Sequence, residues 1–374
     1  MVSEIIIREI IKKGFPAGAQ LTVNTENLAP EERFWVIPGN NGPRWLIPQD
    51  IRYSGLIFKH WKPYDLISRV KWKMLYCASR VGKLGCVPGI ASVGIVGYAQ
   101  SKWLHLGWEG DYSPVPIAYI GTPGATQKAV ISLFDSSSNK LISVAKIPLG
   151  IRASNNILRE YDVLCRMEIE RPGVAPRPIF VDRTHGLSVQ EAIEGKHLGY
   201  KFTHKHAVYL KRLGMSGCVT TIRVEAERLA KRFAKLKNNE ESLGRYIGEL
   251  VYMLKDTTKL PVVQMHGDFK PWNLIQNKDG EIVAVDWEFS EPNQIVSLDV
   301  IHYFYEKGLF KNKKKYHRLY VFLQKYLQEF GVDRVGTQLT KSLLNYYSLW
   351  YVVMLCENGY DATEHIQLLG DLKV

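Results

Sequence analysis

Residues 265–290 of the chain, MHGDFKPWNLIQNKDGEIVAVDWEFS, decide the fold. They are typical of a strand, a polar loop that carries Asp268 and Asn273, and two further strands separated by a turn. The last apolar run ends at Asp286. Carboxylates beside buried strands cost free energy unless they are paired or bind a ligand. The stretch therefore indicates a polar site that is built from two neighbouring loops.

The residue types in this stretch suit the transfer of a phosphoryl group. Such a transfer needs a phosphate held in line with its acceptor and cations that neutralise the developing charge. Mg²⁺ takes oxygen ligands and keeps several waters, so Asn273 and Asp286 would suffice as its protein ligands. We predict Asp268 and His266 as the catalytic residues, Asp268 accepting the proton of an attacking hydroxyl and His266 bracing the loop. Alternatively, the aspartate and the asparagine could simply cap turns.

The segments HGDFKPWN (266–273) and VAVDWE (283–288) carry a resemblance to a known family. They resemble the His-Gly-Asp-x-x-x-x-Asn and Ile-Asp-Trp-Glu signatures of the aminoglycoside phosphotransferase and choline kinase-like family. That family is similar in fold to protein kinases. The resemblance covers about residues 115–374 and implies ATP as the phosphoryl donor and Mg²⁺ as the metal.

The resemblance also implies roles for single residues. Asp268 would be the catalytic base, and Asn273 and Asp286 would be the Mg²⁺ ligands. Asp299 would brace the catalytic region. Glu288 would either contact a cationic acceptor or cap its loop, and the sequence leaves both open.

The upstream half supports the same hypothesis, because a kinase-like fold needs a lysine on its third strand and a glutamate on the next helix. Lys146 ends the run ISVAK, and Glu160 lies within ILREYDVL. The resemblance implies an ion pair between them that holds the lysine against the α- and β-phosphates of ATP. The alternative is a lysine at a strand edge and a solvated glutamate.

Two further segments are predicted to contact the nucleotide, one after the first predicted strand and one at the end of the last. Gly121 and Gly124 lie between the first two strands and are predicted to cover the phosphates. GTPGAT is nevertheless a poor glycine-rich loop, and a plain hairpin turn is the alternative. Adenine is expected against the backbone of Glu191, Ala192 and Ile193.

From about residue 115 the chain contains short β-prone runs separated by turn-forming residues. The first three predict an antiparallel meander. A helix is expected over 155–167, capped by Asn155 or Asn156, and two further strands follow it. From residue 219 onward the spacing of apolar residues mostly predicts helices, except in the stretch 265–290. The predicted strands are 115–121, 128–134, 140–150, 177–183 and 187–193.

The predicted fold class is therefore α+β. We expect a bilobal, protein-kinase-like fold with a small antiparallel sheet lobe, a mostly helical lobe and an additional N-terminal region. The predicted boundaries are 1–112 for an N-terminal extension of unknown role, 113–194 for the nucleotide-binding lobe, and 195–374 for the lobe with the catalytic loop and the acceptor site.

Two local patterns stand out in the N-terminal region. The run RFWVIPGNNGPRWLIP (33–48) predicts a hairpin whose turn lies between Gly39 and Gly42. Further on, Asp65 is predicted to cap a helix that Gly85 would end. We expect this helix to pack in the core with a solvated basic face, and a helix lying on an anionic membrane is the alternative. Its apolar residues are Leu66, Ile67, Val70, Met74, Ala78 and Val81, and its basic residues are Arg69, Lys71, Lys73, Arg80 and Lys83.

Composition limits the partners. The formal net charge of +12 favours anionic partners, although no interleaved basic and aromatic motif predicts nucleic-acid binding. The five cysteines are far apart in the sequence, which favours a reduced, cytoplasmic compartment. A second possibility is a cytoplasmic protein that also contacts the inner face of the membrane. No run is long enough to predict a membrane span. The remaining histidines near residue 200 lack ligand companions and are expected on the surface: His197, His204 and His206.

We predict that the acceptor is a hydroxyl of a small molecule and not of a peptide, because the sequence has no His-Arg-Asp, Asp-Phe-Gly or Ala-Pro-Glu segment. Residues 300–374 hold 10 Lys/Arg against 7 Asp/Glu, which disfavours a polycationic aminoglycoside. The aromatic residues of this segment could form a choline cage but are more typical of a core. We therefore favour a sugar or glycan-related acceptor, which could be anionic or linked to a glycan. The alternative is a weakly active or inactive kinase-like regulatory protein that binds nucleotide.

Overall fold

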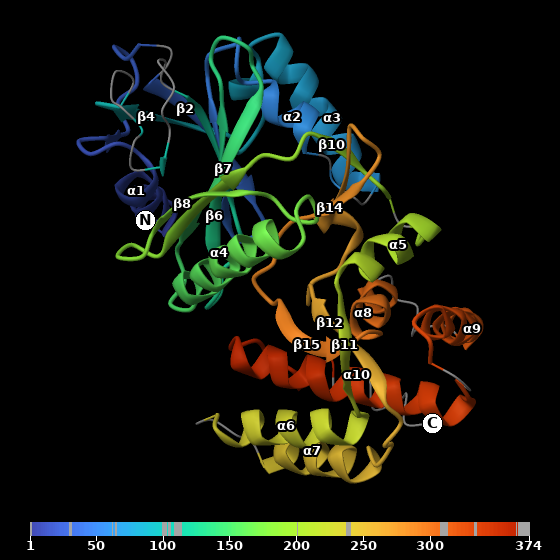
Figure 1. Cartoon of the computed structure of the whole chain (residues 1–374). Coiled ribbons are helices and arrows are strands. Elements are labelled where there is room, and N and C mark those ends of the chain that lie inside the picture. The colour runs from blue at the N-terminus through green and yellow to red at the C-terminus, as the bar shows by residue number, and fades with distance from the viewer. Residues whose placement is uncertain are drawn as a thin grey trace. The chain divides into compact units, whose positions relative to one another are not determined.

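The computed structural model describes residues 2–29, 32–61, 63, 66–98, 103, 106–107, 114–199, 201–236, 241–306, 313–332, 335–363 and 365. The chain forms two compact units, coloured along the chain in Figure 1. Unit 1 consists of Met1–Cys165 and Pro176–Glu194, and unit 2 consists of Arg166–Ala175 and Gly195–Val374. Antiparallel sheets and helices occur in both, so the predicted α+β class is confirmed.

The described strands of unit 1 form one antiparallel sheet in the order β1-β4-β2-β3-β5-β6-β7-β9-β8. The predicted hairpin is β2–β3, in which Gly39 pairs with Gly42, and the predicted meander is β5–β6–β7. Trp45 of β3 pairs with Tyr119 of β5, so the N-terminal strands continue the same sheet. The strands are β1 (Gln20–Thr22), β2 (Arg33–Gly39), β3 (Gly42–Pro48), β4 (Ala91–Val96), β5 (Val115–Ile120), β6 (Lys128–Phe134), β7 (Leu141–Pro148), β8 (Pro178–Asp182) and β9 (Leu187–Glu191).

Helices cover both faces of this sheet. Alternating side chains of a strand point to opposite faces, and Ile131 and Ile147 cluster on one of them with Ile10 of α1 (Val2–Gly14) and with Phe15, which directly follows that helix. On the other face, Trp45 packs against Trp72 of α3 (Leu66–Arg80) and against residues of α2 (Leu56–His60). A short 3₁₀ turn, η2 (Leu84–Cys86), follows α3. Figure 1 shows α4 (Ala153–Glu170) lying across the strands of this unit.

Two helix predictions in unit 1 need correction. Helix α4 begins at Ala153, so Asn155 and Asn156 lie in its first turn and do not cap it. In α3 the predicted orientation is wrong, because the apolar stripe that was expected in the core is exposed, with Leu66 at 76% and Met74 at 67% exposure. The larger aromatic surface of Trp72 on the opposite side is buried in its place. The predicted cap of α3 at residue 65 lies outside the described residues.

Unit 2 contains two small antiparallel sheets, β10-β13-β14 and β11-β12-β15, among its described strands. Figure 1 shows α6 and α7 side by side, next to α10. The strands are β10 (Gly195–His197), β11 (Gly214–Thr220), β12 (Leu260–Met265), β13 (Leu274–Asn277), β14 (Ile282–Ala284) and β15 (Glu291–Ile295). The helices are α5 (His204–Arg212), α6 (Ile222–Ala234), α7 (Glu241–Met253), η4 (Pro271–Asn273), α8 (Leu298–Glu306), α9 (Lys313–Glu329) and α10 (Thr337–Glu357).

The core of unit 2 is rich in aromatic side chains. Tyr303, Tyr346, Tyr347 and Trp350 are at most 1% exposed, which confirms that this aromatic group belongs to the core. His206 is also fully buried, so the prediction that it lies on the surface is wrong. Its ring can be buried because it accepts a hydrogen bond from the Thr203 N–H and stacks on Phe202. None of the described helices has the length and apolar character needed to cross a membrane.

Candidate active site

The loop that follows β12 is fixed by a buried carboxylate of α8. Asp299 accepts hydrogen bonds from the backbone N–H groups of His266 (2.8 Å) and Gly267 (3.0 Å). Burial raises the pKa of Asp299 to about 6. Gly267 has φ of +82°, and a Cβ there would lie 2.2 Å from the carbonyl oxygen of Phe289. Only glycine therefore fits this position without strain.

His266 lies at the centre of the same loop and is 0% exposed. Its Nε2 donates to the carbonyl oxygen of Val285 (3.1 Å), and its Nδ1 accepts from the backbone N–H of Asp268 (3.1 Å). Burial lowers its pKa to about 4, so the ring is neutral at ordinary pH. The imidazole thus links the loop of Asp268 to the residue before Asp286, while its catalytic role stays a prediction.

Three side chains hold the carboxylate of Asp268. Lys270 Nζ lies 2.8 Å and His302 Nε2 lies 3.4 Å from Oδ1, while the Asn273 amide donates to Oδ2 at 2.8 Å. Burial opposes ionisation, but the charge of Lys270 and the hydrogen bond with His302 outweigh it and hold the pKa of Asp268 well below its usual range. The side chain remains 14% exposed. Asp268 is therefore an ionised carboxylate with an accessible edge, as a general base requires.

The β13–β14 hairpin brings Asn273 and Asp286 to one end. Asn273 directly precedes β13 and Asp286 comes two residues after β14, whose Ala284 pairs with Leu274. The Val285 N–H donates to the Asn273 carbonyl at 2.9 Å and closes this end. Asp286 has φ of +72°, a conformation that costs free energy in a residue other than glycine. Its charge acts on both His266 and Asp268, so it lies within the same cluster.

The side chains of Asn273 and Asp286 fit a magnesium ion. The Asn273 amide nitrogen is engaged by Asp268, which leaves the amide oxygen as the metal-binding atom. An amide oxygen and a carboxylate are hard ligands, and Mg²⁺ commonly takes only one or two protein ligands beside waters and phosphate oxygens. Among the side chains that the structure describes, no group of three or more His, Cys, Asp or Glu could hold a metal ion.

In unit 1, β7 and α4 bring Lys146 and Glu160 together. Lys146 Nζ lies 2.6 Å from both carboxylate oxygens of Glu160, and the two residues are 4% and 1% exposed. Lys146 points away from the face on which Ala145 and Ile147 pack, because alternate residues of a strand face opposite sides. The predicted ion pair is therefore present, and its contact with nucleotide phosphates stays a prediction.

The predicted phosphate loop is fastened to its surroundings. The carbonyl oxygen of Gln127 accepts from the N–H groups of Leu149 and Gly150 at 2.9 and 2.8 Å, and its side chain donates to the Gly121 carbonyl. Gly124 has φ of +156°, at the edge of the range that favours glycine. The turn is thus joined to the connection between β7 and α4, just beyond Lys146.

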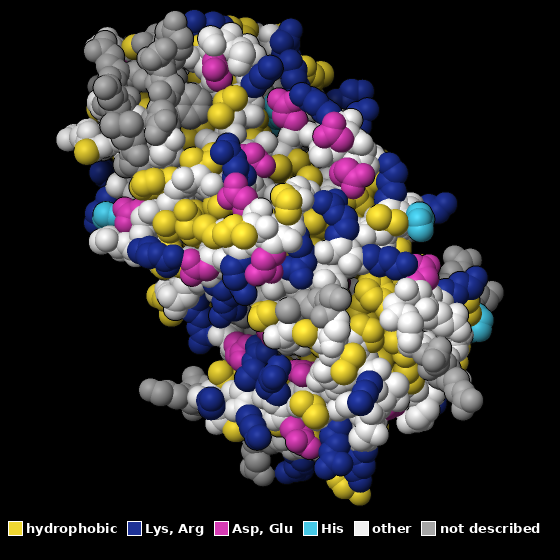
Figure 2. Space-filling model, viewed as in Figure 1, with side chains coloured by type: hydrophobic (Ala, Val, Ile, Leu, Met, Phe, Trp, Pro, Cys, Tyr) yellow, Lys and Arg dark blue, Asp and Glu magenta, His cyan; other side chains and the backbone are white. Residues whose placement is uncertain are grey.

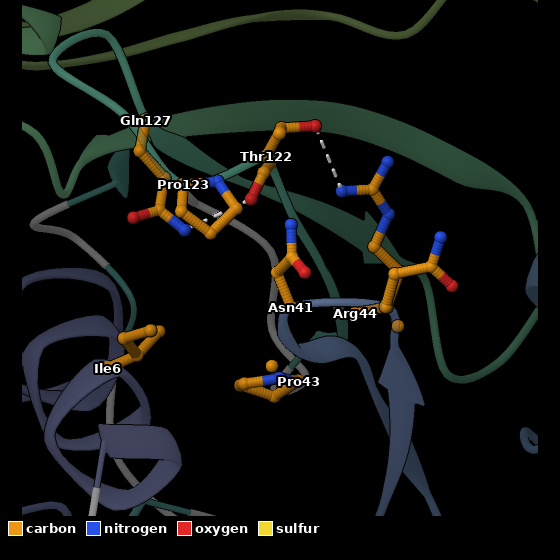
Figure 3. Close-up of a pocket in the computed structure, with 11 residues that line it drawn as sticks. Ile6, Asn41, Pro43, Arg44, Thr122, Pro123 and Gln127 are labelled. Carbon is orange, nitrogen blue, oxygen red and sulfur yellow. Dashed lines mark hydrogen bonds between the residues drawn. The ribbon is translucent and has the colours of Figure 1, made fainter.

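Figure 3 shows a pocket of about 270 Å³ beside this loop, lined by α1, by the β2–β3 turn and by the loop itself. Arg44 donates to the Ile120 carbonyl (3.2 Å) and to Thr122 Oγ1 (3.4 Å), and its guanidinium lies over the ring of Tyr119. A side chain from the N-terminal strands therefore supports the loop that contains Gly121.

The predicted adenine segment follows β9. The Glu191 N–H donates to the Arg177 carbonyl and the Ala192 N–H donates to the Ile142 carbonyl, at 2.9 and 3.0 Å. The carboxylate of Glu191 also accepts from the Arg177 N–H. Both N–H groups are thus engaged within the sheet, while the placement of adenine beside Ile193 stays a prediction.

Two residues that contact Asp268 were not predicted from the sequence. Lys270 follows it by two residues in the same loop, and its proximity to a predicted base in sequence was the available signal. His302 lies three residues after Asp299 on α8, so both project from one face of that helix. Its other ring nitrogen lies 3.0 Å from the hydroxyl of Tyr347 in α10. That second contact depends on helix packing, which no local pattern shows.

No family model and no curated protein matches the chain. Among solved structures, choline kinase LicA from Streptococcus pneumoniae is similar over 67% of this chain and 94% of its own, with 19% identity and a TM-score of 0.43. The GDP complex of wild-type aminoglycoside 2'-phosphotransferase-IIIa covers 68% of this chain and 92% of its own, with 13% identity and a TM-score of 0.45. Macrolide 2'-phosphotransferase type I covers 68% and 89%, with 14% identity and a TM-score of 0.42.

Proposed function

We propose that the chain is an ATP-dependent phosphotransferase that moves the γ-phosphate of Mg-ATP to a hydroxyl of a small molecule. The observation that carries the proposal is the cluster in unit 2, where an accessible, ionised Asp268 lies beside Asn273 and the charge of Asp286. A base held next to an amide and a carboxylate that suit Mg²⁺ provides what phosphoryl transfer needs from a protein.

Each residue has a defined task in this proposal. Asp268 accepts the proton of the acceptor hydroxyl as the oxygen attacks phosphorus, and His302 and Lys270 keep the carboxylate ionised and oriented. Asn273 and Asp286 hold Mg²⁺, which when bound neutralises phosphate charge. Lys146, kept in place by Glu160, binds the phosphates of the nucleotide.

We propose a sugar or glycan-related acceptor. The C-terminal residues 300–374 carry more Lys/Arg than Asp/Glu, which suits an anionic or neutral acceptor better than a polycation. The aromatic side chains that could have caged a choline, such as Tyr346 and Trp350, are buried in the core. This removes the main support for a quaternary ammonium acceptor.

A turnover assay with γ-labelled Mg-ATP and a panel of sugars, sugar phosphates and other metabolites tests the proposal. Transfer of label by the wild-type protein is expected, together with its loss in Asp268→Ala and Asp286→Ala. Asp279→Ala is the matched control, because Asp279 lies in the exposed turn of the same hairpin. Transfer that survives both site variants would refute the site assignment.

The alternative is a kinase-like protein that binds nucleotide without turnover. It is supported by the loop GTPGAT, which is a poor glycine-rich loop because it offers only Gly121 and Gly124 to cover the phosphates. Nucleotide binding, followed by calorimetry, without label transfer to any acceptor would favour this regulatory role over the enzyme.

A further inference from the structure

One face of α3 is apolar and exposed. Its residues Leu66, Ile67, Val70 and Met74 are 76%, 71%, 54% and 67% exposed, and Val81 just beyond the helix is 65% exposed. We call this set the outer face of α3. At 3.6 residues per turn these side chains fall within an arc of about 100°. Isolated exposed apolar residues are common, but an ordered stripe of this kind indicates a binding surface.

The opposite side of α3 explains why the stripe faces outward. Trp72 is 8% exposed, packs against Trp45 and Phe58, and donates its indole N–H to the Trp61 carbonyl at 2.7 Å. Ser79 on the same side is 1% exposed. Trp72 and its neighbours therefore anchor the helix, and the outer face remains apolar although it takes no part in this core.

Basic side chains border the outer face on both sides. At the same helical spacing, Lys71 lies beside one edge of the apolar arc, while Arg69, Lys73 and Arg80 lie beside the other. All four are exposed, and α3 contains no acidic residue. Residues 59–108 hold eight Lys/Arg against one Asp, so this segment contributes +7 of the net charge of +12.

We propose that the outer face of α3 binds the surface of an anionic lipid membrane, with its apolar side chains among the acyl chains and its basic side chains at the headgroups. An amphipathic helix with a polar border rich in Lys and Arg lies in the interface in this way. Anionic headgroups attract each nearby cation, and the attraction weakens with salt. Figure 2 shows Lys and Arg side chains, with several Asp and Glu side chains beside them, along the edge of unit 1 at which α3 lies in Figure 1.

Charge decides against a second copy of this chain as the occupant. Two outer faces packed together would bring the cations of both helices into proximity without an acid from either α3. A lipid surface supplies what a second copy lacks, namely negative charge around an apolar layer. The proposal concerns unit 1 alone and does not depend on phosphoryl transfer.

Vesicle flotation with the full-length protein tests the proposal. The wild type is expected to float with vesicles of phosphatidylcholine mixed with phosphatidylglycerol and to remain behind with phosphatidylcholine alone. Raising the salt concentration should weaken the association. A folded wild-type protein that fails to float with the anionic vesicles overturns the proposal.

Two pairs of variants separate the apolar from the ionic contribution. Val70→Asp with Met74→Asp should lower vesicle binding by about tenfold or more, because two charges would enter the apolar layer. Its control is Val23→Asp with Ile151→Asp, which makes the same charge change at residues of unit 1 that are 75% and 90% exposed. Equal loss in the control pair would overturn the proposal.

The ionic contribution is tested with Lys71→Glu and Lys73→Glu together, which should lower binding to anionic vesicles by about tenfold or more. Lys231→Glu with Lys259→Glu changes the net charge equally at exposed positions in unit 2 and should retain binding. Circular dichroism confirms that each variant is folded. A multi-angle light-scattering measurement in which the α3 variants convert a dimer to a monomer, without any vesicle binding by the wild type, would assign the face to self-association and refute the lipid proposal.

Discussion

The buried ion pair of unit 1 and the Asp268 loop of unit 2 hold a carboxylate in opposite ways. Glu160 offers both oxygens to one amine at 2.6 Å and is 1% exposed. Asp268 is held by three side chains from a loop and a helix, and 14% of its side chain remains exposed. Under the proposed function the first carboxylate would position a lysine, whereas the second would accept the proton of the acceptor hydroxyl.

The largest expected effect tests the availability of Asp268. Asp268→Asn should lower the rate of label transfer from Mg-ATP by roughly 10²–10⁴-fold, because the amide cannot accept the proton. The melting temperature of the variant checks that it is folded under the conditions of the assay. Asp279→Asn, in the turn of the same hairpin, should leave the rate unchanged. A variant with Asn at 268 that keeps the wild-type rate would remove the distinction between the two carboxylates.

Breaking the pair of unit 1 should instead affect stability. Lys146→Met or Glu160→Leu alone leaves one buried charge without its partner and should cost about 3–5 kcal/mol in urea unfolding. The double variant should recover part of this loss, because no lone charge remains. Arg223→Met, which breaks a pair that is 60% and 51% exposed, is the control and should cost less than about 1 kcal/mol. Additive losses in the double variant would contradict a coupled pair.

The pH dependence of stability tests how the loop of unit 2 is braced. The folded His266 has a pKa of about 4, against 6.5 for an unperturbed histidine, so its contribution to stability is full above pH 6.5 and is lost as pH falls towards 4. Asp299 has the opposite sign, because its pKa rises from 3.8 to about 6 and its contribution is lost as pH rises through 6. The two contributions oppose each other in the wild type.

Asp299→Asn should therefore make the dependence steeper. Without the opposing contribution of residue 299, His266 should account for a fall of roughly 3 kcal/mol in the free energy of unfolding between pH 6.5 and 4, as each pKa unit corresponds to about 1.4 kcal/mol. Urea titrations of both proteins at several pH values measure the difference. Parallel curves for wild type and variant would show that Asp299 does not titrate with folding.

The smallest expected effect concerns the backbone that carries Asp268. Gly267→Ala should destabilise the protein by about 1–3 kcal/mol, because the added Cβ would meet the Phe289 carbonyl in a positive-φ conformation. Gly248→Ala in α7 has open space at its Cβ and should stabilise by about 0.5–1 kcal/mol. Thermal unfolding of both variants checks the contrast, and a neutral effect at 267 would indicate that the loop relaxes.

Much of the site in unit 2 could be predicted because its residues are close in sequence. Asn273 and Asp286 meet since a single turn at Asp279 joins two short strands, and hairpin pairing then fixes which residues lie opposite each other. To predict the Lys146–Glu160 contact, it was enough to recognise a strand that is followed by a helix. By contrast, His302 reaches Asp268 through the packing of α8, which lies beyond the range of a local pattern.

The orientation of α3 shows why some features could not be predicted. The sequence places apolar residues on two sides of this helix, one with Val70 and Met74 and the other with Trp72. Periodicity identifies the residues that share a side, but it does not show which side has a partner. The aromatic cluster around Trp45 supplies that partner for Trp72.

The sequence by itself determined the strand, loop and hairpin that carry Asp268, Asn273 and Asp286, because neighbouring residues and turn chemistry set that geometry. Only the tertiary structure decided that β3 joins β5, and that the outer face of α3 remains exposed. The physical reason is that burial is a property of two surfaces. A segment can specify its own apolar face, but the free energy gained depends on the distant residues that cover it.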